Sequence, residues 1–175
     1  MKGVRISVLI FLPIFLSFHV TGSAAEAVEW KISSPAFENG GKIPKKYACD
    51  GANINPRLKI ENTPSNAKSF ALVVDDIDAP GGSYVHWIVW NIDPGLKEIK
   101  ENSIPEGGVQ GMNDFKKRNY GGPCPPGRAH QYAFRIYALD TLLNVSSNGT
   151  KKELEKAMEG HILSRAQLTG SYKRK

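Results

Sequence analysis

The stretch that decides the fold is Val73-Val74-Asp75-Asp76-Ile77-Asp78-Ala79-Pro80, which is followed shortly afterwards by His86-Trp87. An apolar run that begins at Phe70 ends in three acidic residues within four positions, and a turn from Pro80 to Gly82 comes next. Apolar, β-branched and aromatic runs bounded by Pro and Gly indicate strands. The stretch therefore predicts two strands joined by a turn, with carboxylates at the end of the first and an imidazole in the second.

A second unit of turn and strand lies further along the chain. It consists of Gly122-Pro123-Cys124-Pro125-Pro126-Gly127, after which His130-Gln131-Tyr132 begins a strand. Side chains alternate along a strand, so His130 and Tyr132 share one face of it. The two units together supply two imidazoles, a phenol and carboxylates, which predicts a small polar pocket at one end of a sheet.

The rest of the chain is dominated by strand patterns. We predict further strands over residues 29–33 and 167–172 and a helix from Thr150, with a Thr-x-x-Glu capping pattern, to Met158 or Ser164. The strand over residues 84–93 is apolar on both faces and is expected to be covered on both. Regular alternation would place Tyr84, His86, Ile88, Trp90 and Ile92 on one face and Val85, Trp87, Val89 and Asn91 on the other. The pattern indicates a mainly β fold with one or two helices, and a sandwich in particular.

The first 25 residues are expected to be a secretory signal peptide. Lys2 and Arg5 precede an apolar run, and small residues end it near Ala24 and Ala25. A transmembrane anchor is the alternative, but the run is short for a bilayer span and contains Pro13. We therefore expect residues 26–175 to form one domain that is periplasmic or secreted, with no transmembrane span after cleavage.

Charge and cysteine content narrow the classes of function. The chain has 23 basic and 17 acidic residues, but no basic run is longer than three residues, as in Lys173-Arg174-Lys175, which argues against nucleic-acid binding. No Gly-rich phosphate loop of the Walker type and no Gly-x-Ser-x-Gly motif occur, and no cofactor is expected. Cys49 and Cys124 are a candidate disulfide in an exported chain, and two separate buried thiols are the alternative.

Three kinds of site could use the two histidines and the acids. Imidazoles and a phenol can capture an anion, two histidines and a carboxylate can bind a metal, and the same groups can act in general acid–base catalysis. Structural explanations also exist, because Asp78 is a good turn former and His86 lies in an apolar strand. The Asp-x9-His spacing from Asp76 to His86 is no recognised metal motif, so we assign neither metal ligands nor catalytic residues and favour binding.

These motifs resemble those of the phosphatidylethanolamine-binding protein family. The resemblance rests on residues 76–80, His86-Trp87 and residues 122–132. Three further segments are similar to the bacterial branch of that family, often called Raf kinase inhibitor-like: residues 49–56, 137–140 and 160–163. The motifs occur in order with compatible spacing over residues 30–172.

The resemblance implies an antiparallel β-sandwich of a large and a small sheet with one or two peripheral helices. It also implies a non-enzymatic binding protein whose small pocket accepts an anion such as phosphate, or the phosphorylated head group of a lipid. By motif position, the ligand-binding residues are Asp76, His86, His130 and Tyr132, and the walls are shaped by Pro80, Trp87, Pro123, Pro125 and Pro126. The alternatives are a regulator that inhibits a kinase or protease through an unknown protein partner, and a small-molecule hydrolase that uses His86 and His130.

The chain departs from the family pattern at two positions. Ile77 stands where the usual Asp-Pro-Asp-Ala-Pro has its first Pro, and Gln131 stands where the usual His-Arg-Tyr has Arg. Gln131 is expected to point away from His130 and Tyr132 in a regular strand. We therefore expect the pocket to be retained.

Overall fold

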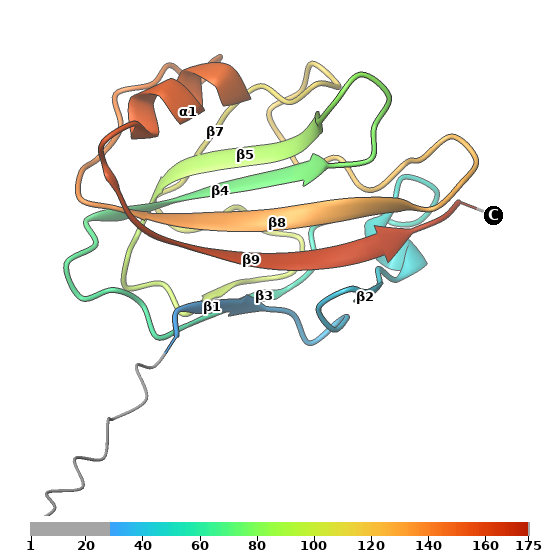
Figure 1. Ribbon diagram of the computed structural model, residues 1–175, viewed down its shortest axis with the longest axis horizontal. Helices are drawn as coiled ribbons and strands as arrows, with labels where there is room; N and C mark the ends of the chain where they lie inside the picture. Colours follow the sequence, from blue (N-terminus) through green and yellow to red (C-terminus); the bar gives the residue numbers. More distant parts are fainter. Residues whose placement is uncertain (1–28, 175) are drawn as a thin grey trace, which may run out of the picture.

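The computed structural model describes residues 29–174, so the expected signal peptide lies outside the described residues. Two sheets and one helix form three layers (Figure 1). The small sheet has the order β1 (Lys31–Ser33), β3 (Leu58–Glu61) and β6 (Glu98–Ile99). The large sheet has the order β2 (Gly41–Lys42), β9 (Ile162–Tyr172), β8 (His130–Leu139), β4 (Ser69–Asp76), β5 (Tyr84–Ile92) and β7 (Val109–Gln110). The helix α1 (Lys151–Met158) lies over the outer face of the large sheet, and a short 3₁₀ helix η1 (Lys45–Tyr47) follows β2.

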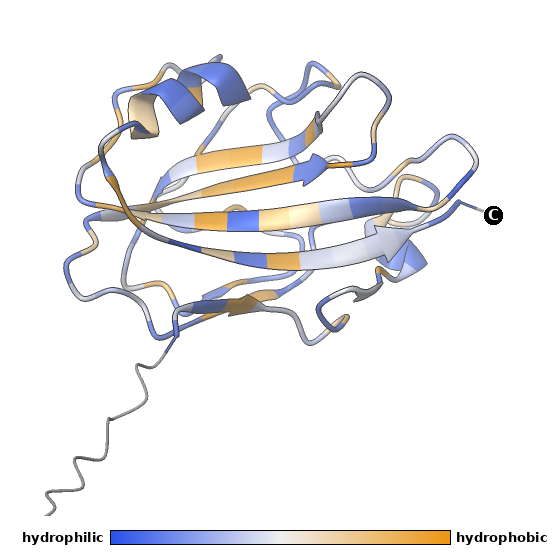
Figure 2. Cartoon of the chain, viewed as in Figure 1, coloured by the Kyte–Doolittle hydropathy of each residue, from blue (hydrophilic) through white to orange (hydrophobic). Residues whose placement is uncertain are grey.

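The large sheet separates two apolar cores. Strand β4 lies between β8 and β5, and each of its residues is buried. Because the strand is covered on both faces, its sequence shows no alternation of apolar and polar residues over its apolar part. Leu72 and Phe134 pack into the core between the two sheets, while Val73 packs with Leu154 in the core beneath α1. Figure 2 shows the hydrophobic residues along β4 and β5 in orange. The mainly β sandwich predicted from the sequence is confirmed.

Element boundaries agree with the predictions except at the end of the chain. The backbone N–H of Thr150 donates to Glu153 Oε2 at 2.8 Å, which confirms the capping box, and α1 ends at Met158, the earlier of the two expected positions. Strand β9 begins at Ile162, before the predicted residue 167. The short strand β2 pairs with β9 in parallel, so the large sheet is mixed and not wholly antiparallel. Strands β2 and β9 are far apart in the sequence and are not joined by a hairpin turn. Hairpin geometry therefore does not force them to run antiparallel.

The regular alternation expected for β5 is wrong at both of its ends. Val74 pairs with Trp87 but Asp75 pairs with Val85, so His86 is an extra residue, a β-bulge. Val85 consequently packs in the core beneath α1, while His86 turns to the face that Trp87 occupies. A second irregularity lies at the end of β5, where Asn91 has a φ of 57° and Ile92 joins the core between the sheets.

The candidate disulfide is present. Cys49 and Cys124 are bonded, with their Cα atoms 5.4 Å apart. The backbone N–H of Cys49 also donates to the carbonyl oxygen of Pro123 at 3.1 Å. These bonds attach the Pro-rich turn before β8 to the loop after η1. Within residues 29–174, no helix has the length and apolarity needed to cross a membrane.

Candidate functional site

A hollow of about 250 Å³ opens where the two turn-and-strand units meet. Strand β4 ends at Asp76, which pairs with Tyr84 at the start of β5 and with Tyr132 near the start of β8. The loop between β4 and β5 and the loop before β8 therefore lie at the same end of the sheet (Figure 1). The hollow is lined by Asp76, Ala79, Pro80, Tyr84, His86, Phe115, Cys124, Pro126 and His130.

Asp76 holds the imidazole of His130. His130 Nδ1 lies 2.7 Å from Asp76 Oδ2, and both side chains are buried. The other oxygen, Asp76 Oδ1, accepts the backbone N–H of Asp78 at 3.0 Å, so the carboxylate itself is fixed by its own turn. A carboxylate beside Nδ1 keeps a proton on that nitrogen and leaves Nε2 for another partner. Asp76 is therefore a positioning residue for His130.

His86 is held in the same way by a backbone carbonyl. Its Nδ1 lies 2.7 Å from the carbonyl oxygen of Gly121 and donates a hydrogen bond to it. As in His130, Nε2 therefore remains for another partner. Burial lowers the pKa of His86 below its usual 6.5, and the Gly121 hydrogen bond and the charge of Asp76 oppose this only in part. The ring is therefore neutral near pH 7, with Nε2 as an acceptor.

Aromatic rings enclose the His86 imidazole. The ring centroids of Tyr84, Phe115 and Tyr132 lie 5.6, 5.1 and 5.2 Å from that of His86, all in edge-on arrangements. Gly121 is required beside them, because a Cβ at this position would lie 2.5 Å from the Phe115 ring. The close approach of the chain at Gly121 thus places both the carbonyl that holds His86 and the ring that covers it.

Tyr132 lies behind the hollow and does not line it. The side chain is fully buried, and its hydroxyl lies near the Asp76 carboxylate and the backbone of Cys124. Burial and the nearby charge of Asp76 raise the pKa of Tyr132, so the group remains a neutral hydroxyl.

Only two of the four prolines that were expected to form the walls of the pocket line the hollow. Pro80 and Pro126 line the hollow, while Pro123 and Pro125 are buried in the turn behind it. The expectation for Trp87 is corrected: its ring borders a different hollow, although the bulge at His86 brings the two neighbouring side chains to the same face of the sheet. The prolines thus stiffen the turn that carries Cys124 and leads to His130.

Four lining residues, Ala79, Tyr84, Phe115 and Cys124, were not predicted from the sequence as parts of the site. Tyr84 could have been found, because it alternates with His86 along the strand. Phe115 belongs to a loop without periodicity, and no sequence signal placed it. Cys124 was treated only as a disulfide partner, yet it lines the hollow as well.

The two departures from the family pattern leave the turn intact. Ile77 retains a backbone N–H that proline would lack, and this N–H donates to the carbonyl oxygen of Gln131 at 3.0 Å. The N–H of Gln131 in turn donates to Asp78 Oδ2 at 3.0 Å, which confirms a loop-structural role for Asp78. Gln131 itself is exposed, unlike His130 and Tyr132. Among residues 29–174, no group of three His, Cys, Asp or Glu residues is arranged to hold a metal ion.

Comparison with known proteins assigns the chain to a family. The family model described as phosphatidylethanolamine-binding protein matches residues 33–173. A UPF0098 protein of Pyrococcus horikoshii is 46% identical over 172 residues, which cover 93% of this chain and 85% of that protein. A UPF0098 protein of Methanothermobacter thermautotrophicus is 45% identical and covers 82% of this chain and 98% of its own length.

Two solved structures share the fold. The phosphatidylethanolamine-binding protein homolog CT736 of Chlamydia trachomatis superposes with a TM-score of 0.80 at 40% identity, over 83% of this chain and 98% of its own. YbcL of Escherichia coli, described as a member of the mammalian PEBP family, superposes with a TM-score of 0.79 at 31% identity, over 84% of this chain and 99% of its own. The chain therefore belongs to the phosphatidylethanolamine-binding protein family.

Proposed function

We propose that this protein is a non-enzymatic binding protein whose hollow at His86 and His130 takes phosphate or a phosphorylated head group. The observation that carries the proposal is the matched orientation of the two rings. Each imidazole has its Nδ1 engaged by a protein oxygen, Asp76 in one case and Gly121 in the other, and both rings line one hollow. Their Nε2 atoms are left for a ligand.

The chemistry of the hollow suits an anion that can also carry a proton. The Asp76 charge opposes an incoming anion unless His130 is protonated, in which case the pair is neutral overall and Nε2 becomes a donor. A neutral His86 accepts a hydrogen bond, and a protonated phosphate or phosphate ester offers a hydroxyl for it. The volume of about 250 Å³ accommodates a head group and not a whole lipid, so an acyl chain would remain outside.

Sulfate binding is expected to weaken as the pH rises from about 5 to 7. Sulfate keeps a constant charge over this range, so any change reports the protein. Because the pKa of free His86 lies below 6.5, and a bound anion raises it, protonation and binding reinforce each other on the acidic side of neutrality. Isothermal titration calorimetry at pH 5, 6 and 7 measures the effect, and a pH-independent affinity would contradict it.

His130→Ala is expected to weaken sulfate binding by about 1–3 kcal/mol, the range of a charge-assisted hydrogen bond. His161→Ala is the matched control, because His161 also pairs with a carboxylate, that of Asp140 at 2.8 Å, but in an exposed turn. The control should bind as the unmodified protein does. Equal affinity in all three proteins would assign His130 a structural role only. Phosphoethanolamine and vesicles that contain phosphatidylethanolamine, titrated in parallel, distinguish a free phosphate ester from a lipid.

The absence of an activated nucleophile in the hollow supports binding over hydrolysis. Cys124 is bonded to Cys49, and no Ser, Thr or Lys belongs to the lining among the residues described. The Asp76–His130 pair resembles the base and orienting group of a hydrolase, but among the described residues no Ser or Thr hydroxyl and no free thiol lines the hollow beside it. We expect no turnover of p-nitrophenyl phosphate or p-nitrophenyl acetate, and turnover that His130→Ala removes would overturn the assignment.

Export to the periplasm or the cell exterior is part of the proposal. The apolar N-terminus and the Cys49–Cys124 disulfide both support it, because disulfides persist in oxidising compartments. The native protein is expected to begin at Ala25 or Glu26. Intact-mass measurement of protein from its own host tests this, and a chain that retains residues 1–20 would contradict it.

A further inference from the structure

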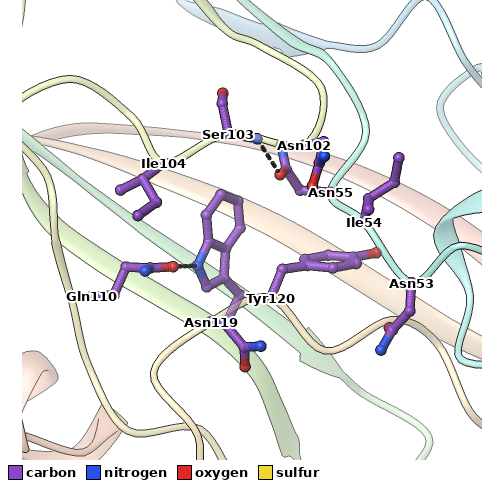
Figure 3. A pocket seen from close by; sticks show the side chains of 10 residues that line it. Asn53, Ile54, Asn55, Asn102, Ser103, Ile104, Gln110, Asn119 and Tyr120 are labelled. Atoms are coloured by element: carbon purple, nitrogen blue, oxygen red, sulfur yellow. Dashed lines mark hydrogen bonds between the residues drawn. The ribbon is translucent and has the colours of Figure 1, made fainter.

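A second and larger hollow has a lining without any charged side chain. It has a volume of about 420 Å³ and lies between the loops after η1, after β6 and before β8, beside Gln110 of β7. Figure 3 shows the side chains around it. Its ten lining residues are Asn53, Ile54, Asn55, Trp87, Asn102, Ser103, Ile104, Gln110, Asn119 and Tyr120.

Several amides on this lining keep hydrogen-bonding groups for a ligand. Gln110 Oε1 accepts the indole N–H of Trp87 at 2.7 Å, which orients the Gln110 side chain and leaves its NH₂ group unused. Asn53 Oδ1 accepts the backbone N–H of Gly122 at 2.7 Å, and its NH₂ group is likewise left. Asn119 is exposed, and its side chain has no protein partner among residues 29–174. Asn55 differs, because its amide is fully used in holding the chain around Lys100 and Ser103.

Apolar groups complete the lining. The rings of Trp87 and Tyr120 form an edge-on pair, with centroids 5.7 Å apart, at the floor of the hollow. Ile104 is 58% exposed at the rim. An oriented donor beside an apolar surface is the arrangement by which ligand pockets fix a small molecule.

We propose that this hollow binds a neutral, polyhydroxylated ligand of the size of a monosaccharide. A charged ligand would find no counter-charge on the lining, and a purely apolar one would cover the amides of Gln110 and Asn53 without replacing their hydrogen bonds to water. A sugar presents hydroxyls at its edge and C–H groups on its face. Its hydroxyls match the amides, and its C–H face matches Ile104 and the aromatic floor.

The two hollows are chemically separate although they use adjacent residues. His86 lines the anion pocket and Trp87 lines the neutral hollow, and the two hollows share no lining residue. The segment before β8 is divided in the same way, with Tyr120 at the neutral hollow and Cys124 at the anion pocket. A variant that disables one site should therefore leave the other intact.

Nuclear magnetic resonance tests the proposal on isotope-labelled protein purified after expression of the full chain. The three tryptophans give three indole N–H signals, and of these only the Trp87 group lies at the hollow; those of Trp30 and Trp90 are buried elsewhere. A panel of neutral methyl pyranosides is titrated. We expect a saturable shift of the Trp87 signal and of the Gln110 side-chain NH₂ signal, with Trp30 and Trp90 unchanged.

Two variants separate binding from a nonspecific solvent effect. Gln110→Glu keeps the acceptor for Trp87 but replaces the NH₂ group, and Asn119→Ala removes an amide with no structural bond; each should weaken the pyranoside about tenfold, the equivalent of one hydrogen bond. Asn144→Ala, an exposed amide outside the hollow, and His130→Ala should leave the affinity unchanged. No saturable Trp87 shift with any pyranoside, or equal shifts in all variants, would overturn the proposal. A Trp87 shift produced by sulfate and not by the pyranosides would also overturn it.

Discussion

Replacing Cys49 and Cys124 together by serine is expected to lower the free energy of unfolding by about 4 kcal/mol. The bond closes a loop with a sequence separation of 75 residues, and a cross-link of this span removes much conformational freedom from the unfolded chain. Both cysteines are only half-buried, so serine introduces little desolvation cost of its own. Urea denaturation of the two proteins under oxidising conditions measures the difference.

The reductant provides the control for this experiment. Dithiothreitol should bring the unmodified protein to the stability of the double variant and should not affect the variant. The double variant should also bind sulfate more weakly, because Cys124 lines the anion pocket and the disulfide holds the turn that leads to His130. A loss of less than about 1 kcal/mol would mean that the backbone hydrogen bond from Cys49 to Pro123 and local packing already hold the turn.

Asp75→Asn is expected to cost about 3 kcal/mol at neutral pH, because it breaks a buried ionic cluster. Asp75 is 1% exposed, and its two oxygens meet Arg135 at 2.6 Å and Lys151 at 2.7 Å. The hydroxyl of Ser83 donates to the same carboxylate. Lys151 is the first residue of α1, so the cluster also attaches the helix to the large sheet.

The cost of Asp75→Asn should vanish in acid. Burial alone would raise the pKa of Asp75, but hydrogen bonds from Lys151 and Ser83 and the charges of Lys151 and Arg135 lower it below 3.8. The stabilisation that the ionised Asp75 gives to the folded state is therefore complete above pH 3.8, its pKa in the unfolded chain. It is lost as the pH falls through the lower pKa that Asp75 has in the folded protein. Denaturation of both proteins at pH 7 and at successively lower pH values tests this.

Asp140→Asn is the matched control for the ionic cluster. Asp140 pairs with His161, but both side chains are nearly half exposed, and exposed pairs contribute less than about 1 kcal/mol. A similar loss in the Asp75 and Asp140 variants, or a loss for Asp75→Asn that persists in acid, would show that burial of the charge is not the cause.

The predicted strands and the helix cap rest on interactions between residues close in sequence. The run from Phe70 to Val74 and its acidic end were sufficient to place β4, and Thr150 with Glu153 was sufficient to place the start of α1. The resemblance at residues 76–80 and 122–132 indicated that Asp76, His86 and His130 share one pocket. The strand and helix predictions succeeded because period, turn chemistry and cap are local properties of a chain, whereas the grouping of the three site residues was implied by the resemblance.

The tertiary structure decided which way the side chains of β5 point. The sequence predicts regular alternation, which would place His86 beside Ile88, on the face opposite Tyr132. Pairing with β4 inserts a bulge at His86, and the bulge turns the imidazole towards Tyr132, on the face that Trp87 also occupies. A bulge arises from the register of two strands and not from the residues of one, so alternation along a single segment cannot reveal it.

By itself, the sequence determined that this protein is a mainly β domain with an acid at the end of one strand and a histidine at the start of another. Only the tertiary structure decided that Phe115 covers His86, that the Gly121 carbonyl fixes its Nδ1, and that Cys49 bonds to Cys124. It also decided that uncharged amides from loops far apart in sequence surround Trp87. The physical reason is that strand period and turn chemistry act over a few residues, whereas these contacts join loops whose meeting depends on the register of the whole sheet.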